Sequence, residues 1–89
     1  MYSIVVAKQA LKDFPHLTVA GLDKKAKALL ELLKENPFQN PPSYEKLLGD
    51  MEGLYSRRIN RKHQLVYQVD EKNKTVKILS AWSHYEAMK

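Results

Sequence analysis

Residues 54–82 have the sequence LYSRRINRKHQLVYQVDEKNKTVKILSAW, in which three strand-forming runs are separated by two short polar connectors. Each run is rich in β-branched, aliphatic or aromatic residues, and the middle run alternates, with Leu65, Tyr67 and Val69 on one side. The connectors have the length of hairpin loops, so consecutive runs are expected to pair antiparallel. We predict strands at residues 54–59, 64–69 and 75–82.

The first half of the chain predicts one strand and two helices. A β-branched run predicts a strand at residues 2–6, and a short apolar face predicts a helix at 7–14, which Pro15 is expected to end. Residues 21–35 carry the strongest helical signal, because leucine and alanine recur at helical spacing opposite a lysine-rich side. Three prolines within residues 36–43 predict a loop.

The predicted order of elements is therefore β-α-α-β-β-β, which indicates an α+β fold. An antiparallel-rich sheet with two helices packed on one face would leave its other face free for a site. The leucine stripe of residues 21–35 is expected to face the core rather than a partner. With 89 residues, we expect one domain over residues 1–89.

Composition excludes several classes of site. The chain contains no cysteine, which excludes disulfides, thiolate metal sites and a cysteine nucleophile. The three histidines, His16, His63 and His84, are far apart in the sequence, and we predict no metal and no cofactor. No apolar run reaches the roughly 20 residues that span a membrane. We expect a cytoplasmic protein without a membrane partner.

The net charge of +5 favours polyanions or acidic partners. Four cations fall within six positions: Arg57, Arg58, Arg61 and Lys62. Because neighbouring residues of a strand point to opposite faces, Arg57 and Arg58 cannot share one surface. We predict that Arg58 faces the open side, and that Arg57 either assists at phosphate or is structural and pairs with a carboxylate.

The remaining polar residues suit phosphodiester cleavage without a metal. Such cleavage of RNA needs a base for the 2′-hydroxyl, an acid for the leaving 5′-oxygen and cations for the phosphate charge, and unpaired bases often stack on aromatics. Glu45, His84, the Arg57–Arg58 pair and Tyr85 supply these residue types. We expect Tyr55, Tyr67 and Trp82 to serve packing, and His63 to be structural.

A longer combination of motifs resembles the YoeB/Txe toxins, which belong to the RelE-like toxins. The matching elements are Pro37-Phe38, Glu45, Leu47, Gly53, Ser56-Arg57-Arg58-Ile59, Leu65-Val66-Tyr67 and His84-Tyr85. They cover about residues 37–85, and their separations match those of the family. Each element is weak alone, whereas together they are specific.

The resemblance implies a RelE-like fold and an mRNA interferase, which cleaves mRNA in the ribosomal A site by 2′-hydroxyl attack and so inhibits translation. It implies Glu45 as the general base, His84 as the general acid, Tyr85 as an RNA contact and Arg58 as a phosphate contact. It also implies an antitoxin of the YefM or Axe kind, operator DNA bound through the antitoxin complex, and a possible homodimer.

One position departs from the family, which has arginine where this chain has Gln64. Loss of a charged contact to the transition state typically costs about 2–4 kcal/mol, or roughly 10²–10³ in rate. Arg58, Arg61 and Lys62 are the nearby cations that could substitute. The sequence leaves three hypotheses: an active nuclease, an attenuated form that only binds antitoxin and operator DNA, and a ParE-like inhibitor of a topoisomerase. ParE-like toxins lack both the base and the terminal His-Tyr.

Overall fold

The computed structural model of this chain describes residues 1–47 and 53–84, the last two of them by their backbone alone. Five strands form one sheet in the order β1-β5-β4-β3-β2. Their bounds are β1 Ser3–Val6, β2 Glu45–Lys46, β3 Leu54–Arg58, β4 His63–Asp70 and β5 Thr75–His84, and the helices are α1 Lys8–Leu11, α2 Phe14–Val19 and α3 Asp23–Glu35. The α+β prediction is confirmed, as are the five longer predicted elements to within two residues.

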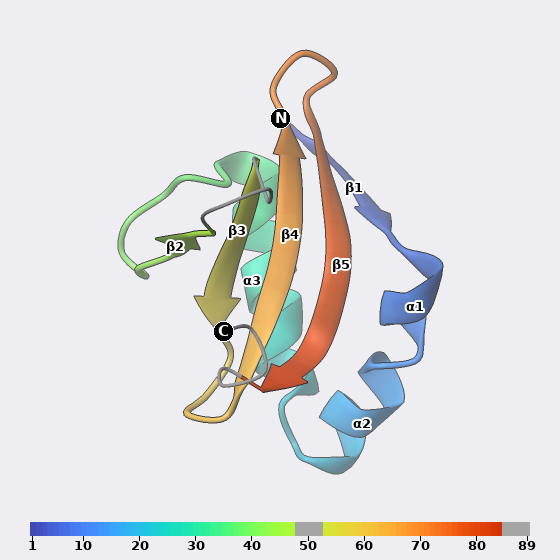
Figure 1. The fold of residues 1–89 in the computed structure, drawn as a ribbon. Coiled ribbons are helices and arrows are strands. Elements are labelled where there is room, and N and C mark those ends of the chain that lie inside the picture. The colour runs from blue at the N-terminus through green and yellow to red at the C-terminus, as the bar shows by residue number, and fades with distance from the viewer. Residues whose placement is uncertain (48–52, 85–89) are drawn as a thin grey trace.

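The sheet is mixed rather than wholly antiparallel. The hairpins β3–β4 and β4–β5 pair antiparallel as predicted, whereas β1 pairs in parallel with β5. The chain crosses from β1 through the helices and the rest of the sheet before β5 forms, so a parallel pairing needs no tight turn. Figure 1 shows β1 and β5 running side by side although more than 65 residues separate them in sequence.

The predicted helix at residues 7–14 is wrong in its extent. Two short helices, α1 and α2, replace it, and α2 begins at Phe14 with Pro15 in its first turn. Proline is tolerated there because the first-turn N–H groups have no intrahelical acceptor. Pro15 therefore starts a helix instead of ending one.

The core lies between the sheet and the helices. Leu33 and Ala26 of α3 are buried together with Leu65 and Tyr67 of β4 and with residues of α1, α2 and β5. In Figure 1, α3 crosses the far face of the sheet, and none of the described helices covers the near face. Within the described residues, no helix is long and apolar enough to cross a membrane. The face opposite α3 is thus where a site can form.

Candidate functional site

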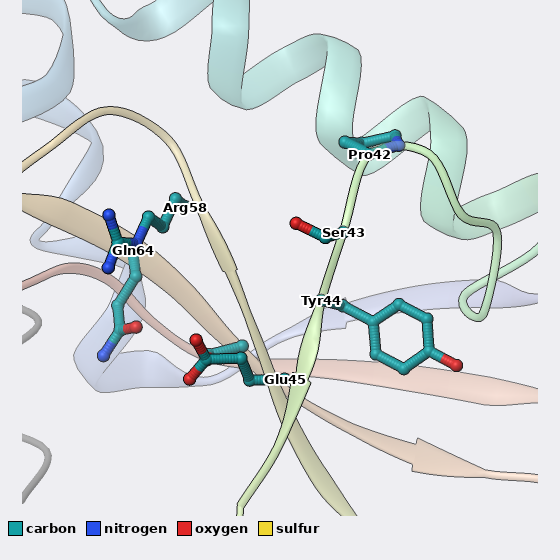
Figure 2. A pocket seen from close by; sticks show the side chains of 7 residues that line it. Pro42, Ser43, Tyr44, Glu45, Arg58 and Gln64 are labelled. Carbon is teal, nitrogen blue, oxygen red and sulfur yellow. The ribbon is translucent and has the colours of Figure 1, made fainter.

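A cavity of about 170 Å³ opens where β2, β3 and β4 meet. Its lining comes from the end of the proline-rich loop and from three strands, and consists of Pro42, Ser43, Tyr44, Glu45, Ser56, Arg58 and Gln64. Figure 2 shows the Glu45 carboxylate, the Arg58 guanidinium and the Gln64 amide extending into the same space from three different strands. Three of the predicted site residues therefore meet at one cavity.

Strand register explains this meeting. Glu45 of β2 lies opposite Ser56 of β3, and Arg58 of β3 lies opposite Gln64 of β4. Directly opposed residues share a face, and Ser56 and Arg58 are two apart on one strand, so all four side chains lie on the same side of the sheet. β2 contains only two residues, and no sequence pattern predicted it. It nevertheless carries the predicted base.

Gln64 presents a buried donor to this site. Its side chain is 1% exposed, and its Nε2 has no hydrogen-bond acceptor among the residues that the structure describes. Leaving a buried donor unsatisfied costs roughly 1–3 kcal/mol. The amide is therefore suited to an oxygen acceptor supplied by a ligand.

Arg57 does not fit the RNA-binding role that we predicted. Its side chain is 1% exposed and points to the face opposite Arg58. Its guanidinium donates to the carbonyl oxygens of Pro37, Gln39 and Pro42 and to the hydroxyl of Tyr67. The structural alternative holds, although the acceptors are backbone carbonyls rather than the carboxylate we expected.

Arg61 and Lys62 lie exposed in the turn between β3 and β4 and do not line the cavity. The side-chain oxygen of Asn60 accepts hydrogen bonds from the backbone N–H groups of Lys62 and His63, which holds this turn closed. The two cations therefore lie in a short ordered turn outside the cavity that Arg58 lines, and they remain candidates for phosphate contacts there.

The predicted acid is placed only through its backbone. Register shifts in the β4–β5 pairing bring Ser83 opposite Gln64 and His84 opposite His63. The end of β5 therefore reaches the strand position that carries Gln64. The imidazole of His84 and all of Tyr85 lie outside the described residues.

Packing contacts are made, as predicted, by Tyr55, Tyr67, Trp82 and His63. His63 is buried and stacks on Trp82, with 3.7 Å between the ring centroids. Tyr55 and Tyr67 stack with centroids 5.9 Å apart. Burial raises the pKa of Tyr67, and the nearby Arg57 guanidinium lowers it by a smaller amount.

Sequence reasoning missed four lining residues, namely Pro42, Ser43, Tyr44 and Ser56. A signal existed for Ser56, because it shares strand parity with Arg58. The loop residues had no comparable signal, since their position depends on the hydrogen bonds that hold the loop.

Comparisons with known proteins give one consistent result. A family model described as the YoeB-like toxin of bacterial type II toxin-antitoxin systems matches residues 6–85. The chain is 33% identical over 88 residues to "Toxin YoeB" of Mycobacterium bovis, covering 96% of this chain and 100% of that protein. It is similar to YoeB in the YoeB-YefM complex from Staphylococcus aureus, with a TM-score of 0.77, 34% identity and coverage of 96% and 99%. A "YoeB/ParE toxin" from Agrobacterium tumefaciens gives a TM-score of 0.82 at 28% identity, with coverage of 93% and 99%.

Proposed function

Because this chain belongs to the YoeB-like toxins of bacterial type II toxin-antitoxin systems, we propose that it is a metal-independent endoribonuclease that cleaves mRNA in the ribosomal A site. The observation that carries this proposal is the meeting of Glu45, Arg58 and Gln64 at one cavity. A carboxylate can serve as the base of metal-free phosphodiester cleavage, and a guanidinium and a buried amide donor can stabilise the phosphate charge. Its ribosomal substrate places the protein in the cytoplasm.

In the proposed reaction, Glu45 accepts the proton of the RNA 2′-hydroxyl while the 2′-oxygen attacks the adjacent phosphorus. The bond from phosphorus to the 5′-oxygen breaks, and His84 donates a proton to that oxygen. The products are a 2′,3′-cyclic phosphate and a 5′-hydroxyl. Arg58 stabilises the charge on the non-bridging oxygens, and Tyr85 holds the RNA, as the family resemblance implies.

Gln64 has a defined part in this proposal. Its Nε2 donates a hydrogen bond to a non-bridging phosphate oxygen, which satisfies the buried donor. An uncharged donor stabilises developing charge less than a guanidinium does. The resulting rate is lower than with arginine but not zero, because Arg58 lines the same cavity.

The test is cleavage of a defined mRNA on programmed ribosomes. We expect the unchanged chain to cleave, Gln64→Arg to cleave roughly 10²-fold faster, and Glu45→Gln to lose most activity. Gln68→Arg is the matched control, because Gln68 lies exposed on the same strand outside this cavity. The substitution adds the same charge as Gln64→Arg. Equal acceleration by both arginine variants would assign the gain to net charge and would contradict the role of Gln64.

A second candidate function comes from the similarity to the "YoeB/ParE toxin" of Agrobacterium tumefaciens. If no variant cleaves ribosome-bound mRNA, a gyrase supercoiling assay decides between inhibition of a topoisomerase and a form that only binds its antitoxin and, through that complex, operator DNA.

We further propose that a YefM-like antitoxin binds this chain. The Staphylococcus aureus relative has been solved in a heterotetrameric YoeB-YefM complex and as a YoeB dimer. The net charge of +5 favours an acidic segment that folds over the site face. Self-association of this chain is part of the same proposal.

A further inference from the structure

Arg57 is a buried cation on the opposite face of β3 from the cavity. Ser56 and Arg58, its two neighbours, line the cavity, and Arg57 between them points toward the core. A buried charge is costly unless hydrogen bonds or a counter-charge compensate it. Among the described residues, no carboxylate forms an ion pair with Arg57, so its hydrogen bonds carry that compensation.

These hydrogen bonds hold the loop between α3 and β2. Nη1 donates to the Pro42 carbonyl at 2.6 Å, and Nη2 donates to the carbonyls of Gln39 at 2.8 Å and Pro37 at 3.0 Å. Nε donates to the Tyr67 hydroxyl at 3.2 Å. The guanidinium also lies 4.9 Å from the centroid of the Tyr44 ring. One side chain thus binds three carbonyls of a loop that prolines deprive of N–H donors.

The same loop leads directly into Glu45, which lines the cavity. Pro42, which accepts the shortest of these hydrogen bonds, is three residues before Glu45, and Figure 2 shows residues 42–45 in one run along the cavity. β2 itself pairs Glu45 with Ser56 and Lys46 with Tyr55, and the Leu47 N–H donates to the Leu54 carbonyl. The position of Glu45 therefore depends on the hydrogen bonds between Arg57 and the loop carbonyls that precede it, which together form a tether.

We propose that Arg57 is a positioning residue, which holds residues 37–42 and thereby sets Glu45 against Arg58 and Gln64. The catalytic part of this inference rests on the proposed nuclease function. Arginine suits the role because its planar guanidinium has five donors in a fixed geometry, whereas lysine has three on one atom. A lysine cannot span three carbonyls and a hydroxyl that surround a guanidinium.

The kinetic test compares Arg57→Lys and Arg57→Met with the unchanged chain over a series of programmed-ribosome concentrations that reaches saturation. We expect kcat to fall roughly 10- to 100-fold, with KM changed less than about threefold, because a displaced base slows chemistry more than binding. Tyr67→Phe is the control, since it removes the hydroxyl partner of the guanidinium and that hydroxyl's own hydrogen bond to the Pro37 carbonyl, but leaves the three loop carbonyls bound by Arg57. We expect it to lower Tm while kcat stays near that of the unchanged chain.

A double-mutant cycle separates positioning from general loosening. If Arg57 acts through Glu45, Arg57→Lys lowers the residual rate of Glu45→Gln by less than about threefold. The inference would be overturned if the losses of rate in Arg57→Lys and Glu45→Gln were additive in the double mutant. It would also be overturned if Tyr67→Phe lost as much kcat as Arg57→Lys for the same loss of Tm.

Hydrogen–deuterium exchange tests the tether without any activity. We expect Arg57→Lys to speed exchange of the amides at residues 38–40 and 43–45, while β4 and β5 stay protected. If the unchanged chain does not cleave RNA, the proposed function fails, and this exchange still decides the tether. Unchanged loop exchange in Arg57→Lys would overturn the inference.

Discussion

Two adjacent arginines of β3 lie in opposite environments. Arg58 is exposed and lines the cavity, whereas Arg57 is buried against the proline-rich loop. Their charge and chemistry are the same, and the alternation of the strand alone separates them. A run of basic residues in a strand therefore predicts about half of its members for one surface.

Tyr67 makes stability depend on pH in the alkaline range. Burial raises its pKa above the ordinary value of 10.0, so the native state retains this proton after the unfolded state has lost it. The free energy of unfolding should therefore fall as pH rises above about 10, by at most about 1.4 kcal/mol per pH unit for one group. Urea unfolding between pH 8 and 11 should show a shallower fall in Tyr67→Phe. Tyr2→Phe is the comparison variant, because the pKa of the half-buried Tyr2 is also raised, mainly by its hydrogen bond with Glu71, so it should flatten the slope for a different reason. An unchanged slope in Tyr67→Phe would contradict the assignment.

Gly53 sets the entry into β3 through its backbone conformation. Its φ is +79°, and a Cβ there would meet only the Val69 carbonyl at 3.8 Å, so space is not the constraint. A side chain in the left-handed region costs about 1–2 kcal/mol. Gly53→Ala should lower the free energy of unfolding by about 1 kcal/mol in urea titrations, and Gly53→Asn by less, because asparagine tolerates this region. Equal losses in both variants would point to crowding by the added side chain instead.

At the scale of elements, regular sequence patterns predicted the long helices and strands, whereas the short elements were not predicted. Period-two and helical spacing located β3, β4, β5 and α3. The two residues of β2 are too few to show a period, and Pro15 is compatible with the start of a helix as well as with its end. Local sequence does not distinguish these cases, because the packing of the whole chain decides them.

The charge of the whole molecule should govern how fast it meets an acidic antitoxin. The net charge is +5. Between 0.01 and 1 M salt the Debye length falls from about 30 to about 3 Å, and steered association slows on the order of tenfold or more. Stopped-flow binding to the antitoxin encoded beside this chain should show this fall in the association rate constant, with a smaller change in dissociation. A rate constant that is independent of salt would argue against charge complementarity, and the absence of any tight complex would contradict the antitoxin proposal.

The sequence by itself determined the α+β class, the strands of the second half and the residue types of the site. Those properties follow from local periodicity and from motifs that lie along the chain. Only the tertiary structure decided that β1 joins β5 in parallel, that Glu45, Arg58 and Gln64 line one cavity, and that Arg57 binds the loop carbonyls. Each of these depends on which distant backbone groups pair, and pairing is chosen by the burial and hydrogen bonding of the complete chain rather than by any one segment.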